Sequence, residues 1–127
     1  EARLFLPVDG NSSWPVVLER TPYDWSSVSS ATKWTDQGIA YILQHVRGRY
    51  GSEGRFSPFA DEGWGKHKDG AETVAWIRQQ SWCNGQVGTY GGSASAITST
   101  LLGPATDKII CQVFREGGSD FDDHLAY

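Results

Sequence analysis

The stretch GTYGGSASAIT, residues 88–98, places one serine between a strand pattern and a helix pattern. Residues 86–90 are predicted to form a short strand, and residues 93–103 a helix that a Gly-Pro pair ends. A side chain can be presented at the tip of so sharp a turn only where its neighbours are small, as they are throughout residues 91–96. We therefore predict that Ser93 is exposed at the end of a strand and that the next helix starts within a residue or two.

A serine in this position can act as a nucleophile. The α/β hydrolases carry their nucleophile at such a strand-to-helix junction. The turn also leaves the backbone N–H of Ala94 at the helix N-terminus, where it can stabilise a developing oxyanion. The usual motif is Gly-x-Ser-x-Gly, but Ser95 stands in place of the second glycine. A packing turn without any chemistry would have a similar composition, so this stretch alone leaves both interpretations open.

The rest of the chain alternates between strand and helix patterns. We expect strands at residues 2–8, 14–19, 39–46 and 108–114, helices at residues 29–37 and 69–80, and a Gly-rich loop over residues 47–67. The first two strands are predicted to form a hairpin or a neighbouring pair. Strands interleaved with helices predict an α/β fold, with a mainly parallel sheet flanked by helices.

Length and composition exclude several classes of function. The chain has 127 residues, enough for one domain with a real core but few for a complete hydrolase. Its net charge of -4 and scattered basic residues give no patch for a nucleic acid. No apolar run approaches the ~20 residues of a membrane span, and the first residues have no signal-peptide pattern. We expect a soluble chain with neither a nucleic-acid nor a membrane partner, and the compartment stays open.

The two cysteines, Cys83 and Cys111, have neither CxxC spacing nor a nearby histidine pair. We predict two buried free thiols, because a free cysteine packs like a small hydrophobic residue. Neither a metal site nor a cofactor is expected.

Several stretches at suitable separations resemble one family. They are PVVLERTPYDW (15–25), VRGRYGSEGRFSPF (46–59), DGAETVAWIRQQSWCNGQVGTYGGSASAITS (69–99) and KIICQVF (108–114). Together they are similar to the N-terminal part of the α/β-hydrolase domain of the cocaine esterase and X-Pro dipeptidyl peptidase group, the CocE/NonD hydrolases. The resemblance covers nearly all of residues 2–127. It implies a serine hydrolase that acts on esters, amides or X-Pro peptides, with a helical cap and a C-terminal β-rich domain beyond the core.

The resemblance also implies roles for particular residues. Ser93 matches the nucleophile and the backbone N–H of Ala94 matches one oxyanion donor. Tyr23 matches the tyrosine whose hydroxyl is the second donor, and a phenol is a good neutral donor to an oxyanion. Asp122 and Asp123 resemble the segment where α-amino-acid ester hydrolases bind a substrate ammonium, although a solvated acidic loop would have the same composition. We interpret a further set as a structural network of the Gly-rich loop, namely Arg47, Arg49, Ser52 and Glu53.

Two departures from the family pattern stand out. Where members commonly have an aspartate in Gln-Asp-x-Arg-Gly, this chain has His45. Ala96 replaces the glycine that usually follows the nucleophile by three residues, which crowds the helix against the strand without forbidding the turn.

The base and the acid of a catalytic triad are missing from the expected positions. In this fold both follow the nucleophile, in the order Ser, Asp or Glu, His. His124 comes soon after Ser93, in the segment that leads into the cap in the family, so we do not expect it to be the base. His45 and His67 precede Ser93, and structural roles are expected for both.

We therefore predict one truncated α/β-hydrolase core over residues 1–127, inactive by itself. Its chemistry would be acyl transfer through Ser93 to hydrolyse a small ester, amide or peptide substrate. The alternative is a non-catalytic binding or assembly module that keeps the hydrolase fold. A sheet cut off before its later strands would leave an unpaired edge and uncovered apolar surface, so a homo-oligomer is also predicted.

Overall fold

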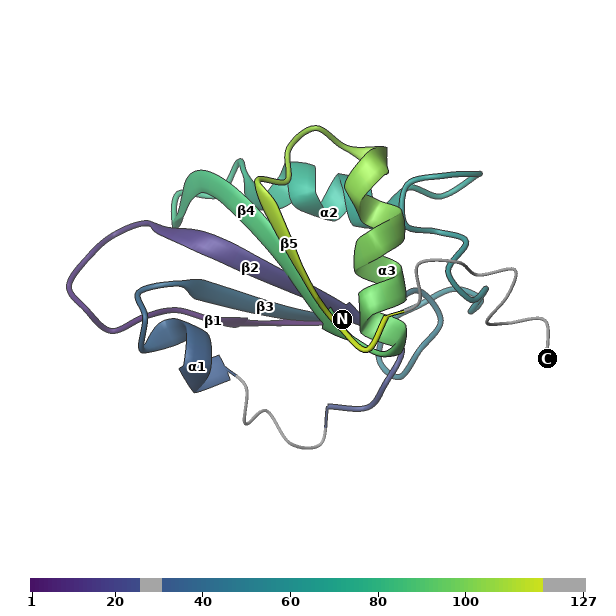
Figure 1. The fold of residues 1–127 in the computed structure, drawn as a ribbon, viewed down its shortest axis with the longest axis horizontal. Helices are drawn as coiled ribbons and strands as arrows, with labels where there is room; N and C mark the ends of the chain where they lie inside the picture. Colours follow the sequence, from purple (N-terminus) through teal and green to yellow (C-terminus); the bar gives the residue numbers. More distant parts are fainter. Residues whose placement is uncertain (26–30, 118–127) are drawn as a thin grey trace.

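A computed structural model describes residues 1–25 and 31–117 of the chain. Its five strands form one sheet in the order β1-β3-β2-β4-β5 (Figure 1). In chain order the elements are β1 (Ala2–Phe5), β2 (Trp14–Thr21), α1 (Ala31–Thr35), β3 (Ala40–His45), α2 (Asp69–Ile77), β4 (Cys83–Gly92), α3 (Ala94–Leu102), a 3-10 turn (Gly103–Ala105) and β5 (Cys111–Arg115).

Three of the four strand pairs are parallel, namely β2 with β3, β2 with β4 and β4 with β5. The predicted α/β fold with a mainly parallel sheet is confirmed. The predicted hairpin is wrong, because β1 pairs antiparallel with β3 and not with β2. The β2-α1-β3 crossover puts β3 directly beside β2. The edge that a hairpin would use is therefore already occupied, and β1 adds to the far side of β3.

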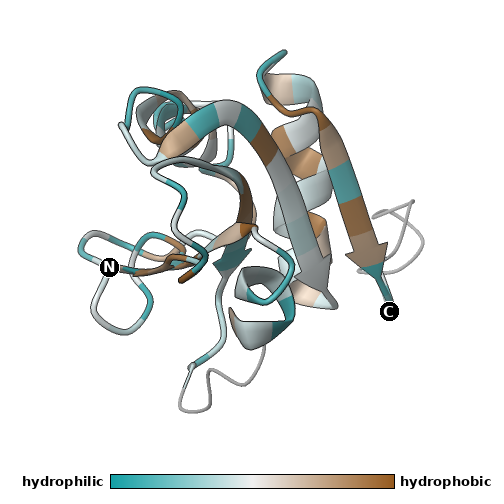
Figure 2. Ribbon diagram, turned by 90° about the vertical axis from the view of Figure 1, so that its left-hand side faces the viewer, coloured by the Kyte–Doolittle hydropathy of each residue, from teal (hydrophilic) through white to brown (hydrophobic). Residues whose placement is uncertain are grey.

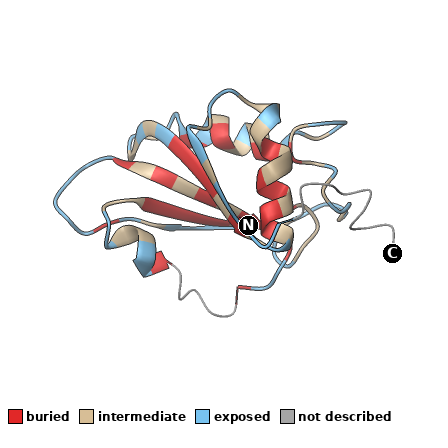
Figure 3. Ribbon diagram, viewed as in Figure 1, coloured by how far each residue is buried: buried red, intermediate tan, exposed pale blue. Residues whose placement is uncertain are grey.

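Helices cover both faces of the sheet, each over its own core (Figure 1). On one face α2 and α3 pack their apolar side chains, including Val74, Ile77 and Leu102, against β2, β3 and β4. On the other face α1 packs Ala31 against Tyr41 and Leu43 of β3. Buried residues accordingly run along the central strands and the inner sides of α2 and α3 (Figure 3). Alternation of side chains along each strand supplies both cores.

Some local expectations differ from the structure. The segment Cys83–Gly85, which looks like a turn, is the start of β4, so this strand is longer than the sequence predicts. The prediction of two buried thiols is wrong for Cys111, which is exposed on the edge strand β5, while Cys83 is half-buried. In the part of the chain that the structure describes, no helix is long and apolar enough to cross a bilayer, and no group of three metal-ligating side chains gathers.

Candidate active site

Ser93 occupies a tight turn between β4 and α3. It follows Gly92, the last residue of β4, and precedes Ala94, the first residue of α3, and it is exposed. Its backbone has φ 53° and ψ -123°, outside the regions that non-glycine residues usually adopt. Such a conformation costs about 1–3 kcal/mol and persists only where the surroundings impose it. The predicted strand-to-helix turn is therefore present, with a strained serine at its tip.

Backbone contacts from two elements hold this turn. The N–H of Ser93 donates to the carbonyl of Arg115 at the end of β5 (2.9 Å). The carbonyl of Ser93 accepts from Ala96 (2.9 Å) and Ile97 (3.3 Å) in the first turn of α3. A side chain at Gly91 would overlap the carbonyl of Ser95, so α3 can approach β4 this closely only because residue 91 has no Cβ. Ala96 is fully buried and the turn still forms around it.

The structure brings Tyr23 to this serine from seventy positions earlier in the chain. Its hydroxyl lies 2.9 Å from Ser93 Oγ, and the N–H of Ala94 points to the same phenol oxygen at 3.4 Å. Tyr23 follows β2, and Ser93 follows the neighbouring parallel strand β4. Because the carboxyl ends of parallel strands meet at one edge of a sheet, the two residues come together there. The Tyr23 hydroxyl therefore contacts both Ser93 Oγ and the Ala94 N–H.

The Gly-rich loop supports the site through backbone and ionic contacts. Arg47 forms a two-bond ion pair with Asp69 at the start of α2 (2.7 and 2.6 Å). Arg49 donates from Nε to the carbonyl of Pro22 (2.9 Å), one residue before Tyr23. Ser52 Oγ donates to the carbonyl of His45 (3.0 Å), and the carbonyl of Glu53 accepts from Gly48 (3.0 Å). These contacts fit the structural network that the sequence predicts.

Neither described histidine is bonded to Ser93. His45 is buried at the end of β3, stacked on Trp25 with ring centroids 3.3 Å apart, and its Nδ1 lies 3.1 Å from a Glu1 carboxylate oxygen. Burial lowers the pKa of His45, and the hydrogen bond with Glu1 acts in the opposite direction. Its Nε2 is buried without a partner in residues 1–25 and 31–117. His45 is thus a packed ring, in keeping with the expected structural role.

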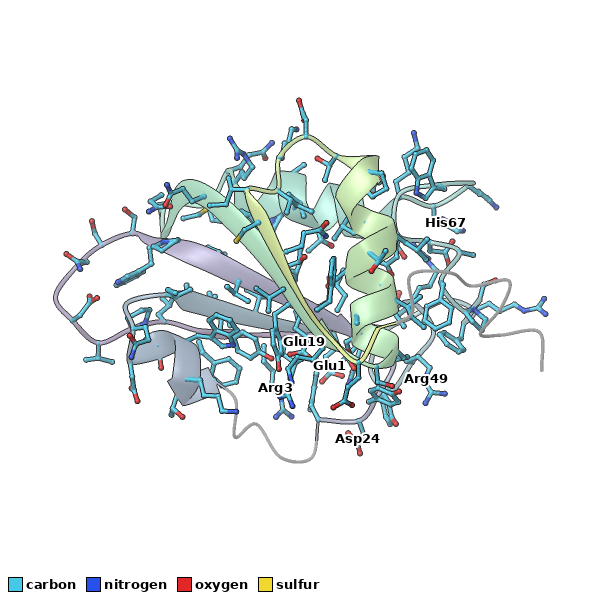
Figure 4. The ribbon with its side chains drawn as sticks, viewed as in Figure 1. Glu1, Arg3, Glu19, Asp24, Arg49 and His67 are labelled. Carbon is cyan, nitrogen blue, oxygen red and sulfur yellow. The ribbon has the colours of Figure 1, made fainter. Side chains whose placement is uncertain are left out.

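His67 lies in the loop before α2. This loop contacts the C-terminal end of α3 through Trp64, whose Nε1 donates to the carbonyl of Leu101 (3.2 Å). Figure 4 shows His67 on that side, whereas Ser93 is at the opposite end of α3. His124, Asp122 and Asp123 lie outside the described residues, so their predicted roles stay predictions.

Glu19 is a half-buried residue near the candidate site that the sequence analysis did not single out (Figure 4). It lies on β2 and accepts a hydrogen bond from the Tyr41 hydroxyl (2.6 Å). Burial raises the pKa of the Glu19 carboxyl, while hydrogen bonds with Tyr41 and Ser95 lower it. Ser95 is the second residue of α3, so this carboxylate lies next to the tight turn of residues 92–94, which we call the elbow. In the sequence, Glu19 differs from its surroundings only as the acidic residue of the apolar strand pattern at residues 14–19.

A cavity of about 570 Å³ lies away from the serine, between α2 and β3. Its lining includes Gln44, Asp69, Thr73 and Trp76 but neither Ser93 nor Tyr23. The candidate chemistry therefore lies at the exposed turn around Ser93 rather than in this cavity.

A mainly parallel sheet with helices on both faces and a strained serine between a central strand and the following helix defines the α/β-hydrolase class of fold. Solved structures agree. A CocE/NonD family hydrolase from Staphylococcus aureus superimposes with a TM-score of 0.67 at 23% identity, covering 80% of this chain and 21% of that one. An α-amino acid ester hydrolase gives a TM-score of 0.64 at 27% identity, covering 79% of this chain and 20% of that one.

The chain belongs to the X-Pro dipeptidyl-peptidase (S15) family, whose model matches residues 1–127. Cocaine esterase from Rhodococcus sp. (strain MB1 Bresler) is 37% identical over 99 residues, which are 71% of this chain and 16% of that protein. The family resemblance predicted from the sequence is thereby confirmed. The chain spans about a fifth or less of the length of these relatives.

Proposed function

We propose that this chain carries the nucleophile half of a serine hydrolase, with Ser93 as the nucleophile. The observation that carries the proposal is that the Tyr23 hydroxyl contacts both Ser93 Oγ and the Ala94 N–H at the strained strand-to-helix turn. Family membership supports a hydrolase or esterase-like activity.

The proposed reaction is acyl transfer. Ser93 Oγ attacks the carbonyl carbon of the substrate while its proton passes to a general base, and the carbonyl oxygen becomes an oxyanion. The Tyr23 hydroxyl and the Ala94 N–H, which contact each other without substrate, would then donate to that oxyanion. Collapse of the tetrahedral intermediate expels the alcohol or amine, which takes a proton, and water later hydrolyses the acyl-enzyme. Each oxyanion donor of this kind is worth about 10²–10³ in kcat.

The base and the acid are proposed to come from residues other than 1–127. Within residues 1–25 and 31–117, Tyr23 is the hydrogen-bond partner of Ser93 Oγ, and both histidines have other surroundings. A serine without a base is a poor nucleophile near neutral pH. We therefore propose that residues 1–127 are an incomplete core and have no measurable ester turnover by themselves.

The substrate is proposed to be a small ester, an amide or an X-Pro peptide. These classes follow from the names of the matched family and relatives, an X-Pro dipeptidyl-peptidase family, a cocaine esterase and an α-amino acid ester hydrolase. Binding of a substrate ammonium by Asp122 and Asp123 would favour α-amino esters or peptides with a free N-terminus. No metal or cofactor takes part in the proposed reaction.

The test uses the complete gene product that contains these residues, with p-nitrophenyl esters and an X-Pro p-nitroanilide as substrates. Ser93→Ala is expected to lower kcat by at least about 10⁴-fold, because removing a triad nucleophile leaves only residual catalysis. Tyr23→Phe should lower kcat by about 10²-fold, since it removes one oxyanion donor and leaves the ring in place. Trp64→Phe is the control, because Trp64 is as exposed as Tyr23 (54% and 49%) and its N–H donates to the carbonyl of Leu101 at the other end of α3.

Labelling with a fluorophosphonate gives a second measurement. Ser93 in the complete protein should be labelled, and Ser93→Ala should not. A folded complete protein that is neither labelled nor active on esters, amides or X-Pro peptides would instead support the non-catalytic module. Robust turnover by residues 1–127 alone would show that a base is present in this segment, with His124 or a partner chain as the first place to look.

A further inference from the structure

We infer that Arg49 is a positioning residue that holds Tyr23 at Ser93 by fixing the Pro22–Tyr23 peptide group. The inference rests on the proposed function, because it concerns the tyrosine that would bind the oxyanion.

Both polar atoms of this peptide group are hydrogen-bonded. Its oxygen, the carbonyl of Pro22, accepts from Arg49 Nε (2.9 Å). Its N–H, that of Tyr23, donates to Thr21 Oγ1 (3.1 Å). A peptide group is planar, so restraining both its oxygen and its N–H fixes the orientation of the plane. The direction in which the Tyr23 side chain leaves the backbone follows from that plane.

Tyr23 needs this restraint because its ring is half exposed, at 49%. Its hydroxyl contacts only Ser93 and Ala94 among the hydrogen bonds of the described residues. A ring with so little packing takes its position largely from its backbone. A displacement of about 1 Å in a catalytic group can cost about 10²-fold in rate.

The side chain of Arg49 is itself held in place by two aromatic rings. Its guanidinium lies over the rings of Tyr50 and Phe56, with Cζ 5.0 and 5.2 Å from the two centroids. No ion pair with a carboxylate is formed by Arg49 among the residues that the structure describes. Its guanidinium therefore contacts the Pro22 carbonyl, the two ring faces and, at 3.5 Å, the Tyr50 hydroxyl. A hydrogen bond from a charged donor is roughly twice as strong as a neutral one.

A neighbouring arginine, Arg47, anchors the loop to α2, so Arg49 is not needed for that contact. Arg47 joins the same loop to α2 through Asp69 (2.7 and 2.6 Å). Arg49 instead contacts the segment after β2 that carries Tyr23 and Asp24. Figure 4 shows the side chains of Arg49 and Asp24 in the same lower part of the view. The loop therefore has its own anchor, and Arg49 connects it to the candidate active site.

The test is a double-mutant cycle in the complete gene product. Arg49→Leu and Arg49→Lys are each made in the parent and in Tyr23→Phe, and kcat and KM for a p-nitrophenyl ester are measured. In the parent background Arg49→Leu should lower kcat by about 10-fold or more with less than about a threefold change in KM, since the phenol donor acts in the transition state. Arg49→Lys should recover part of the loss, because an ammonium keeps the charge and can reach a carbonyl but lacks the planar stacking.

In the Tyr23→Phe background the effect of Arg49→Leu on kcat should shrink to less than about twofold, because the hydroxyl that Arg49 positions is then absent. Arg55→Leu, an exposed arginine of the same loop, is the control and should leave kcat unchanged. Melting temperature and far-UV circular dichroism report whether each variant folds. If Arg49→Leu does not fold, the Lys variant carries the same cycle, with a smaller loss expected in the parent and none in Tyr23→Phe.

Equal losses from Arg49→Leu in both backgrounds would overturn the inference, as would a loss confined to KM. A large loss from Tyr23→Phe combined with none from either Arg49 variant would also overturn it while leaving the proposed function intact. The proposed function fails by a different result, namely full activity in Ser93→Ala and Tyr23→Phe.

Discussion

At the residue scale, the elbow depends on one position where any side chain would collide with backbone. An added Cβ at Gly91 would overlap the carbonyl of Ser95 and would lie 2.6 Å from the nitrogen of Ala96. Both atoms belong to the first turn of α3, which cannot rotate out of the way as a side chain can. A Cβ added at Gly92 would lie 3.8 Å from its nearest neighbour, the carbonyl oxygen of Arg115, which is an ordinary van der Waals contact.

We predict that Gly91→Ala destabilises the protein by about 2 kcal/mol, since overpacking a tight contact typically costs 1–3 kcal/mol. Gly92→Ala is the matched control and should cost less than about 1 kcal/mol, because it needs no movement of the backbone. Urea denaturation measures both, and hydrolase activity of the complete gene product should fall more in Gly91→Ala, since a displaced α3 would carry the Ala94 N–H away from the Tyr23 hydroxyl. Equal stabilities for the two variants would show that the close approach of α3 to β4 is not required.

At the element scale, β5 is the sheet edge with the most apolar exposure. In the described part of the chain its one strand neighbour is β4, so its outer edge has no strand partner. Val113 and Phe114 on this strand and Ile110 just before it are about half exposed or more. Figure 2 shows hydrophobic residues at both ends of this edge strand. An unpaired edge with exposed apolar side chains favours pairing with another chain.

The homo-oligomer predicted from the sequence stays a prediction, and we expect its copies to pair through the edge strand β5. Residues 1–127 produced alone should self-associate at micromolar concentration, and Val113→Lys with Phe114→Lys should shift the population toward monomer, because charge on an edge strand opposes pairing. Val8→Lys replaces an exposed apolar residue far from this edge and should leave association unchanged. Sedimentation measures all three. A monodisperse monomer of 14.0 kDa in the parent would contradict the prediction.

At the scale of the whole molecule, one buried ion pair joins the sheet, the Gly-rich loop and α2. Arg20 on β2 and Glu62 in the loop are both almost fully buried and form two hydrogen bonds, at 2.7 and 3.2 Å. Arg20 also donates to Gln44 on β3 and to Thr73 on α2. The backbone carbonyl of Glu62 accepts from Ala71 of α2 (2.9 Å). These contacts fix the position of the loop that also carries Arg47 and Arg49.

Removing one partner should cost more than removing both. We predict that Arg20→Met or Glu62→Leu alone destabilises by about 3–5 kcal/mol, since each leaves an uncompensated buried charge. The double variant should cost clearly less than the sum, because no charge is then left buried. Arg47→Met breaks a more exposed pair (30% and 18%) and should cost only about 1 kcal/mol. Additive losses in the urea-denaturation cycle would show that Arg20 and Glu62 act independently.

The sequence by itself determined the features that depend on neighbouring residues. The small side chains of residues 91–96 predict the turn at Ser93, because steric crowding in a sharp turn is local. Alternating strand and helix patterns likewise predict the α/β class and the mainly parallel sheet, and the motifs around Tyr23 and Ser93 indicate the family.

Only the tertiary structure decided which distant segments meet. The patterns of β1 and β2 suit a hairpin equally well, but the free edge available to β1 is on β3, which depends on where the β2-α1-β3 crossover places that strand. The exposure of Cys111 depends in the same way on β5 being an edge. The contacts of Arg49 with Pro22 and of Arg20 with Glu62 join residues that are 27 and 42 positions apart in the chain, and no local pattern selects their partners. Many positions could offer a carboxylate or a backbone carbonyl to an arginine, so the packing of the whole sheet and loop selects the pairs that form.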